Sequence, residues 1–202
     1  MIKIREEDPM KEREALLNIL VQYSFKYDPA SPFKLRSGKM SDVYINAKAV
    51  ALTAQGMALV GQVVWEKVAN LDAQAIGGLT LGADPIAYAT ALFAALTGKG
   101  KLDVFIVRKE AKAHGTGKGI EGPVAPGKRV IVVDDVVTTG GATLTAIERV
   151  LDAGMKILKV VPLVDRQEGG RENIEAWGLE YDPVFTKEDL LRRYSKQAGQ
   201  RS

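Results

Sequence analysis

Two adjacent aspartates and the glycine-rich segment after them are the residues of this chain best suited to bind a substrate. Asp134 and Asp135 follow Val130–Val133, an apolar run typical of a strand buried on both faces of a parallel sheet. We expect that strand to end at the aspartates. Residues 138–143, Thr-Thr-Gly-Gly-Ala-Thr, lead into a helical pattern that stops at Gly154. Backbone N–H groups at a helix start bind anions, and paired carboxylates can hold vicinal hydroxyls, so the segment predicts a sugar-phosphate site.

A purely structural role explains this segment less well. One aspartate after a strand is often a helix cap, but two consecutive side chains leave the backbone in different directions. They also repel each other unless a cation or ligand is near. The segment lacks the GxxxxGK[ST] pattern of a Walker loop. We therefore favour substrate binding.

A second candidate is the cationic, glycine-rich segment 108–119. Its basic side chains are Arg108, Lys109, Lys112, His114 and Lys118, and His114 is the single histidine of the chain. Charges at this density do not pack in a core, so we expect a loop that stays mobile until an anion neutralises it. Such a loop could close over a pyrophosphate leaving group and exclude water. The alternative is a solvated charged hairpin.

The same segment contains one misleading motif. Residues 117–122 match GxGxxG, the dinucleotide fingerprint, which has meaning only between a strand and a helix. Pro123 and Pro126 follow it and no helical period does, so we exclude a Rossmann cofactor site.

Helical and strand patterns alternate along the rest of the chain. We expect helices from Asp8-Pro9 toward Tyr23, over Ala54–Ala69 and over Pro85–Leu96, and strands at Ser41–Asn46, Gln74–Ile76, Val104–Val107 and Lys159–Val164. Gly77–Pro85 is expected to be a loop, and Gln197–Ser202 a frayed end. Alternating strands and helices predict a doubly wound α/β fold around a parallel sheet.

Composition limits the class of protein. A chain of 202 residues can bury a substantial core as one α/β domain. It has no apolar run near the roughly 18 residues that span a bilayer, and its first residues lack the apolar core of a secretory signal. The absence of cysteine excludes disulfides and thiolate metal sites and permits a reducing cytoplasm. A net charge of +3, with acids and bases mixed, argues against nucleic-acid binding.

Several motifs resemble those of a known family. Residues 134–143 resemble the signature of the type I phosphoribosyltransferases, which bind phosphoribosyl pyrophosphate (PRPP). Three further patterns resemble those of the orotate phosphoribosyltransferases within this group. These patterns are Arg-Lys-x-x-Lys-x-His-Gly at 108–115, Phe-x-Leu-Arg-Ser-Gly-Lys with Ser-x-x-Tyr at 33–44, and Asp-Arg-Gln-Glu-Gly-Gly at 165–170. The motifs occur in the family's order and span about residues 33–172.

The resemblance implies roles for individual residues. Lys112, His114, Asp134 and Asp135 would be catalytic. The cationic loop and the signature segment would bind PRPP, through Arg108, Lys109, Lys112, His114, Asp134, Asp135, Val136, Val137, Thr138, Thr139, Gly140, Gly141, Ala142 and Thr143. Orotate would contact Thr138, Arg166 and Arg36, and Arg36 stands where many relatives have lysine. Gly77–Pro85 would be the pyrophosphate loop and act through its backbone. The ligands of the metal stay open.

The resemblance also implies a fold, a reaction and an assembly. A central parallel sheet flanked by helices would form one domain over residues 1–202, with 70–165 as the core sheet and about 1–45 and 165–195 as a small hood. The reaction would be Mg²⁺-dependent transfer of the phosphoribosyl group from PRPP to orotate, giving orotidine 5′-monophosphate and pyrophosphate in de novo UMP biosynthesis. The enzyme would be a cytoplasmic homodimer that shares its catalytic loops between subunits, with no nucleic-acid or membrane partner.

Two alternatives stay open from the sequence. The Asp134 motif fits a phosphoribosyltransferase for a purine or another pyrimidine equally well, although Lys112, His114 and Arg166 favour an acidic acceptor. The second alternative is a PRPP-sensing regulator or a nucleic-acid-binding protein on the same fold. No helix-turn-helix appendage or aromatic-basic pattern supports it.

Overall fold

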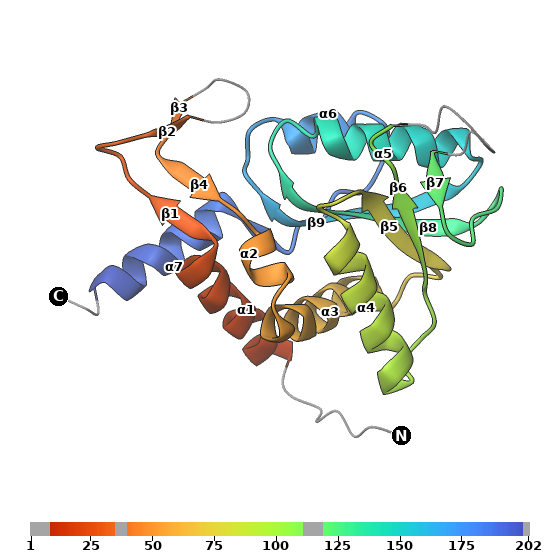
Figure 1. Ribbon diagram of the computed structural model, residues 1–202, viewed down its shortest axis with the longest axis horizontal. Helices are drawn as coiled ribbons and strands as arrows, with labels where there is room; N and C mark the ends of the chain where they lie inside the picture. Colours follow the sequence, from red (N-terminus) through yellow and green to blue (C-terminus); the bar gives the residue numbers. More distant parts are fainter. Residues whose placement is uncertain (1–8, 35–39, 111–118, 200–202) are drawn as a thin grey trace.

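The computed structural model describes residues 9–34, 40–110 and 119–199, and it shows an α/β fold around a central sheet (Figure 1). Within these residues the sheet has six strands, in the order β10 (Phe185–Thr186), β9 (Lys156–Asp165), β8 (Arg129–Val137), β5 (Ala75–Leu79), β6 (Asp103–Val107) and β7 (Ile120–Glu121). All neighbours pair in parallel except β7, which runs antiparallel to β6. The predicted fold class is confirmed.

Helices cover both faces of this sheet. On one face lie α5 (Gly141–Asp152) and α6 (Gly170–Glu175), and on the other lie α1 (Pro9–Tyr23), α3 (Ala54–Val68) and α4 (Asp84–Thr97) (Figure 1). The side chains of β8 alternate accordingly. Val130 and Val132 join the core under α5, while Ile131 and Val133 join the core under α3 and α4. A strand buried on both faces needs an unbroken apolar run, and this requirement explains the pattern at Val130–Val133.

The chain reverses its direction across the sheet between β5 and β8. It passes from β5 through α4 to β6 on one side, and from β8 through α5 to β9 on the other. In parallel sheets the carboxyl ends of the strands at such a point flank a crevice where ligands bind. The fold therefore brings the segments after β5 and β8 to one crevice.

The predicted helices are observed to within about two residues, but several other boundaries are corrected. β8 runs on through both aspartates to Val137, because β9 continues beside it and supplies a parallel partner up to Asp165. β5 runs on to Leu79, since its glycines allow close packing rather than a turn: a Cβ on Gly77 would lie 2.0 Å from the Phe105 carbonyl oxygen. α5 already begins at Gly141.

The C-terminal segment is also more ordered than expected. A helix, α7 (Lys187–Gly199), includes the first residues of the predicted frayed end. α7 lies against α1, and the ring of Tyr194 contacts Phe25 and Tyr27 at centroid distances of 5.6 and 5.9 Å. Packing of this amphipathic helix, rather than its own propensity, stabilises it.

Short elements lie between α1 and α3. β1 (Phe25–Tyr27) pairs antiparallel with β4 (Val43–Ile45), and β2 (Phe33–Lys34) pairs with β3 (Met40–Ser41). A single turn of helix, α2 (Lys48–Ala51), follows β4. These elements stand beside the carboxyl ends of the central strands (Figure 1).

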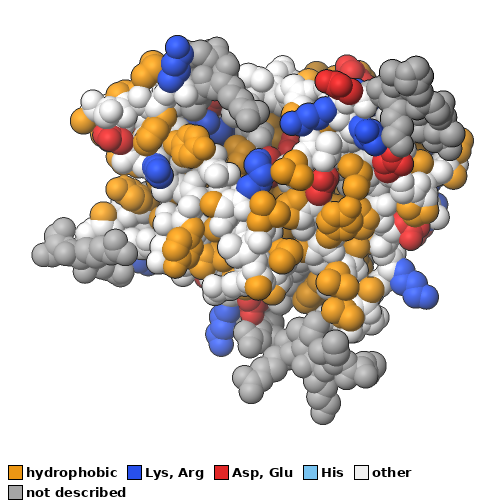
Figure 2. Space-filling view, in the orientation of Figure 1, with side chains coloured by type: hydrophobic (Ala, Val, Ile, Leu, Met, Phe, Trp, Pro, Cys, Tyr) orange, Lys and Arg blue, Asp and Glu red, His pale blue; other side chains and the backbone are white. Residues whose placement is uncertain are grey.

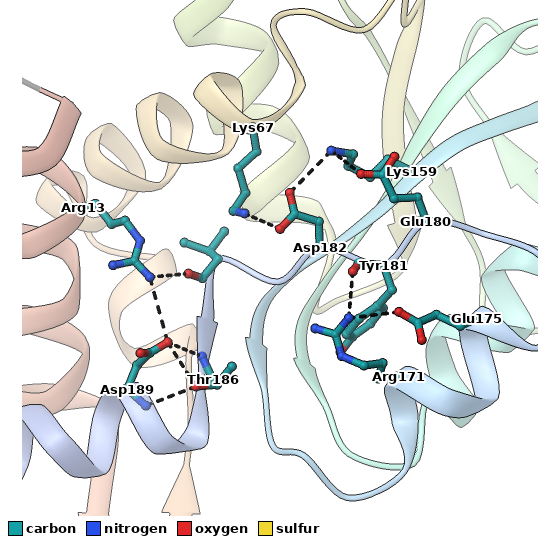
Figure 3. A network of polar contacts seen from close by, with 11 residues as sticks. Arg13, Lys67, Lys159, Arg171, Glu175, Glu180, Tyr181, Asp182, Thr186 and Asp189 are labelled. Carbon is teal, nitrogen blue, oxygen red and sulfur yellow. Dashed lines mark hydrogen bonds and ion pairs between the residues drawn. The ribbon is translucent and has the colours of Figure 1, made fainter.

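Polar contacts fasten α1 and α3 to the C-terminal part of the chain (Figure 3). Arg13 of α1 donates to the Val184 carbonyl at 3.0 Å and pairs with Asp189 at 3.9 Å. Asp182 pairs with Lys67 of α3 at 2.5 Å and with Lys159 of β9 at 3.4 Å. These contacts tie α1 and α3 to β9, to residues 182–184 before β10 and to the start of α7.

The core under α5 gives a direct test of this packing. Ile147 is fully buried, whereas Leu151, one turn further along the same helix, is 39% exposed. Replacing Ile147 by Ala should lower the free energy of unfolding by roughly 2–5 kcal/mol, because it leaves a cavity. Leu151→Ala is the matched control and should lower it by no more than about 1 kcal/mol. Urea denaturation followed by circular dichroism measures both, and equal losses would contradict the assigned burial.

Candidate active site

The paired aspartates lie inside strand β8, at its carboxyl end, and both are buried. Asp134 is level with Pro162 of β9. Consecutive side chains of a strand point to opposite faces, so the two carboxylates find different partners. Asp134 Oδ2 accepts a hydrogen bond from Thr143 Oγ1 of α5 at 2.7 Å. Its Oδ1 accepts from the Asp135 backbone N–H at 2.9 Å.

The environment of Asp134 favours its neutral form. Burial, followed by repulsion from Asp135, raises the pKa of Asp134 to about 7, although the hydrogen bond from Thr143 acts in the opposite direction. A nearby cation or a donor from a substrate would favour the ionised form. The site is therefore electrostatically suited to a ligand that brings hydroxyl donors or positive charge.

Lys48 is a site residue that sequence reasoning missed. This lysine of α2 forms an ion pair with Asp135, whose other oxygen accepts from the Val136 N–H at 2.9 Å. Lys48 belongs to no motif, and only the folding of α2 against the sheet edge brings it there. The one signal in the sequence is a lone cation in the apolar stretch after Asn46.

The segment after β5 approaches the same carboxylates. A Cβ on Gly82 would lie 2.5 Å from Asp135 Oδ1 and 3.0 Å from Asp134 Oδ1, so a larger residue there would displace the two carboxylates. Thr80 donates to Asp84 Oδ2 at 2.7 Å, and the Thr80–Leu81 peptide is cis. The close approach of the Gly82 backbone to the aspartates is compatible with the prediction that the Gly77–Pro85 loop binds pyrophosphate through backbone groups.

The signature segment forms the N-terminus of α5. Gly140 adopts φ 85°, and Gly141, Ala142 and Thr143 make the first helical turn. The first N–H groups of a helix have no partner within it, so they can bind an anion. Thr138 and Thr139 lie in the bend before the helix.

Residues after β9 support this bend from the side. Asn173 of α6 donates to the Thr139 carbonyl at 2.9 Å. Gly170 packs so closely that a Cβ there would lie 2.4 Å from Val137 Cγ1 and 2.6 Å from the Thr138 carbonyl oxygen. Close packing against the bend before α5 therefore requires glycine at 170, whereas Gly169 has open space around it and a left-handed backbone, φ 94°, that favours glycine.

Arg166, at the end of β9, brings two sequence motifs together. It is 4% exposed, and its Nη2 contacts Ser41 Oγ at 3.1 Å, the Val43 carbonyl oxygen at 3.3 Å and Glu168 Oε1 at 2.9 Å. Its backbone N–H donates to the Val137 carbonyl at 2.8 Å, which sets it beside the end of β8. The motif at 165–170 therefore meets the one containing Ser41 at the site.

Arg108 and Lys109 stand at the end of β6. Together with Thr80 and Glu121 they line a cavity of about 440 Å³, which joins them to the segment after β5. Arg108 pairs with Glu121 at 3.1 Å, and its N–H donates to the Gly119 carbonyl at 2.9 Å, closing the base of the cationic loop. Arg149 of α5 donates to the Lys109 carbonyl at 3.0 Å, a contact no motif predicted. Lys112, His114 and Arg36 lie outside the described residues.

Comparisons with known proteins match this arrangement. The model of the phosphoribosyl transferase domain matches residues 71–185. An orotate phosphoribosyltransferase of Aquifex aeolicus is 43% identical over 90% of this chain and 99% of that protein. The chain belongs to the orotate phosphoribosyltransferase family. The resemblance inferred from the motifs is confirmed.

Solved structures of this family agree with the fold. The crystal structure of the Mycobacterium tuberculosis orotate phosphoribosyltransferase with Fe(III) dicitrate has a TM-score of 0.77 and 38% identity, and it covers 89% of this chain and 98% of that one. A second structure of that enzyme, in complex with PRPP, has a TM-score of 0.72 and 34% identity over 92% and 93% of the two chains.

The residues that the structure describes contain no group of three or more His, Cys, Asp or Glu side chains that could hold a metal ion. In the same part of the chain, none of the helices combines the length and apolar character needed to cross a membrane.

The raised pKa of Asp134 predicts a pH-dependent stability. The neutral carboxyl stabilises the fold at low pH, and this contribution is lost as the pH rises from near 3.8 through about 7. Since asparagine does not ionise, the difference in free energy of unfolding between Asp134→Asn and the wild type should shift in favour of the variant between about pH 5 and about pH 8. Denaturation at both pH values measures it. Asp152→Asn, at an exposed site of α5, is the control, and an unchanged difference for Asp134→Asn would contradict the raised pKa.

Proposed function

We propose that this protein transfers the phosphoribosyl group of PRPP to orotate, giving orotidine 5′-monophosphate and pyrophosphate in de novo UMP biosynthesis. One observation carries the proposal. The paired carboxylates of β8, the N-terminus of α5 and buried Arg166 meet at the carboxyl ends of neighbouring strands, in a member of the orotate phosphoribosyltransferase family. Each of the three has the chemistry that one part of these substrates requires.

PRPP would lie along β8 and α5. Asp134 and Asp135 would accept hydrogen bonds from the ribose hydroxyls, since both carboxylates stand at the end of the strand beside Gly82. Residues 137–143 would surround the 5-phosphate, which the N–H groups of the first turn of α5 can bind. The backbone after β5 would face the pyrophosphate.

Orotate would bind at the end of β9. Its carboxylate suits Arg166, because a guanidinium presents a planar fork of donors that carboxylates bind in a bidentate fashion. Thr138 precedes α5 next to Gly170, and Arg36 would complete the acceptor site. The neighbouring Ser41 and Val43 orient the guanidinium through Nη2.

Catalysis would depend on neutralising the leaving pyrophosphate and excluding water. Displacement at C1 of the ribose has carbocation character, so charge on the leaving oxygen must be stabilised electrostatically. Lys112 would neutralise or protonate that oxygen, and His114, Arg108 and Lys109 would contact the pyrophosphate. The Arg149 contact to Lys109 would hold the base of this loop in place.

Mg²⁺ fits this site as a partner of PRPP rather than as a resident ion. The described residues offer two adjacent carboxylates but no set of three metal-binding side chains, and Mg²⁺ is often bound by one or two carboxylates together with substrate phosphates. When bound, the ion would neutralise pyrophosphate charge.

The first test is an absorbance assay of the purified protein with PRPP and Mg²⁺. Orotate, uracil, adenine, hypoxanthine and guanine are offered separately. We expect turnover of orotate alone, dependent on both PRPP and metal. Turnover of another base would overturn the acceptor assignment, and PRPP binding without turnover would favour a regulator.

Lys112→Ala should lower kcat roughly 100- to 10 000-fold while leaving the fold intact, because the variant cannot neutralise the leaving oxygen. Lys118→Ala removes a charge from the same loop without a proposed role and is the matched control. Steady-state kinetics and circular dichroism measure the two effects. A variant with near-normal turnover would rule out the role of Lys112.

We propose that the protein forms a homodimer through the exposed face of α4. Large apolar side chains recur every four residues along this face: Tyr88, Leu92 and Leu96, which are 50%, 59% and 41% exposed. Leu81, next to the site, is 56% exposed. Figure 2 shows hydrophobic side chains gathered over this helix. Exposed apolar stripes of this kind mark association surfaces. A second copy on this face would lie beside the active site, where its cationic loop could enter.

Mixing two inactive variants tests the shared loop. Lys112→Ala lacks the loop lysine and Asp135→Asn lacks a ribose ligand, so each homodimer should be inactive. In a mixed dimer one active site combines an intact pocket with an intact loop, and random reassociation should restore about one quarter of wild-type activity. No recovery, with mixed dimers present by mass spectrometry, would show that the loop acts within its own subunit.

We further propose that residues of about 1–45 and 165–195 contribute a hood over the acceptor, except β10 (Phe185–Thr186), which is the edge strand of the central sheet, and that the reaction takes place in the cytoplasm. The contacts of Arg166 with Ser41 and Val43 join the two parts of this hood. The absence of cysteine is compatible with a reducing compartment.

A further inference from the structure

The buried guanidinium of Arg166 forms an ion pair with the carboxylate of Glu168. Glu168 Oε1 lies 2.9 Å from Arg166 Nη2, and the two side chains are 26% and 5% exposed. Arg166 Nε, by contrast, is shielded from solvent and has no hydrogen-bond partner. The Nε and Nη2 edge of a guanidinium is one on which a carboxylate binds through both oxygens. Glu168 therefore binds one of the two donors on this edge, Nη2, and leaves Nε without a partner.

The residue between Arg166 and Glu168 adopts an unfavourable backbone conformation, and the turn at this residue brings the Glu168 side chain onto Arg166. Gln167 has φ 57°, and among the described residues it is the only one other than glycine with a positive φ. Gly169 follows with φ 94°. Two hydrogen bonds hold the turn: the Gln167 N–H donates to Asp165 Oδ1 at 2.7 Å, and the Glu188 N–H donates to Gln167 Oε1 at 3.2 Å. A left-handed residue with a side chain often marks a functional site.

An arriving carboxylate cannot share this place with Glu168. Two carboxylates on one guanidinium edge would repel each other in a largely buried position, and each would lack part of its counter-charge. Either the acceptor's carboxylate binds elsewhere, or Glu168 leaves when it arrives. The unpartnered Nε favours the second case, because a bidentate ligand would satisfy a donor that Glu168 leaves unpaired.

We propose that Glu168 occupies the place of the acceptor's carboxylate on Arg166 in the substrate-free protein and is displaced when the acceptor binds. The inference rests on the proposed function, in which Arg166 binds orotate. Glu168 would thus lower the affinity for acidic acceptors and keep the buried arginine paired between turnovers. Acceptors without a carboxylate would gain nothing from displacing it.

The test compares two ligands that differ by one carboxylate. Orotidine 5′-monophosphate and uridine 5′-monophosphate are titrated calorimetrically into the wild type, Glu168→Gln and Glu172→Gln. The ratio of the two dissociation constants reports recognition of the carboxylate alone. Glu168→Gln keeps the shape and a neutral hydrogen bond to Arg166, so we expect it to raise the preference for orotidine 5′-monophosphate about tenfold. Glu172→Gln removes an equivalent charge from exposed α6 and should leave the ratio unchanged.

The outcomes separate this inference from the proposed function. In the first case the wild type turns over orotate and prefers orotidine 5′-monophosphate, but Glu168→Gln leaves this preference unchanged or lowers it. Glu168 is then a permanent partner that positions Arg166, and the inference is wrong. If both glutamate variants raise the ratio equally, general loss of negative charge explains the effect and the inference is also wrong. If the wild type neither turns over orotate nor distinguishes the two nucleotides, the proposed function itself fails.

Discussion

The pairing of β8 with β9 beyond Val133 is the interaction on which the site depends. This parallel ladder continues to Val137 and Asp165, and the Arg166 N–H donates to the Val137 carbonyl just past its end. The ladder carries the two aspartates as part of a rigid strand and sets Arg166 level with the start of the bend before α5. A sheet position is more precise than a loop position, so one set of backbone hydrogen bonds defines the spacing between the paired carboxylates, this bend and Arg166.

Helix α5 connects this ladder to the cationic loop. Its first turn supplies free N–H groups and the Thr143 hydroxyl that holds Asp134, and two turns later Arg149 holds the Lys109 carbonyl at the base of the loop. The segment that would bind the 5-phosphate and the segment that would cover the pyrophosphate are therefore fixed to one helix. Its apolar face, with Ile147 fully buried, anchors both to the core.

The site without substrate compensates its own charges. Lys48 pairs with Asp135, Glu168 pairs with Arg166, and burial favours the neutral form of Asp134. Isolated charges in such a poorly solvated place are costly, so the chain supplies partners for them. Under the proposed function, substrates would have to replace these partners: ribose hydroxyls would donate to the two aspartates, and an acceptor carboxylate would pair with the guanidinium.

Much of this protein could be predicted from the sequence. The apolar run at Val130–Val133, the alternation of helices and strands and the motif at 134–143 indicated the fold class and the family, because local patterns reflect burial and backbone geometry directly. The exact ends of β5 and β8 could not be predicted in this way. Glycines and aspartates are typical of turns, yet here Gly77 and Asp134 lie in strands because neighbouring strands pair with them and pack against them.

The sequence by itself therefore determined most groups of the candidate site, though not Lys48, since residue types and local spacing specify a glycine-rich helix start, a carboxylate pair and a basic loop. Only the tertiary structure decided which of them meet. Lys48 reaches Asp135 across 87 residues and Arg166 reaches Ser41 across 125, and such contacts depend on how the strands are ordered and the helices packed. No local pattern encodes them, because their partners become neighbours only when the whole sheet has formed.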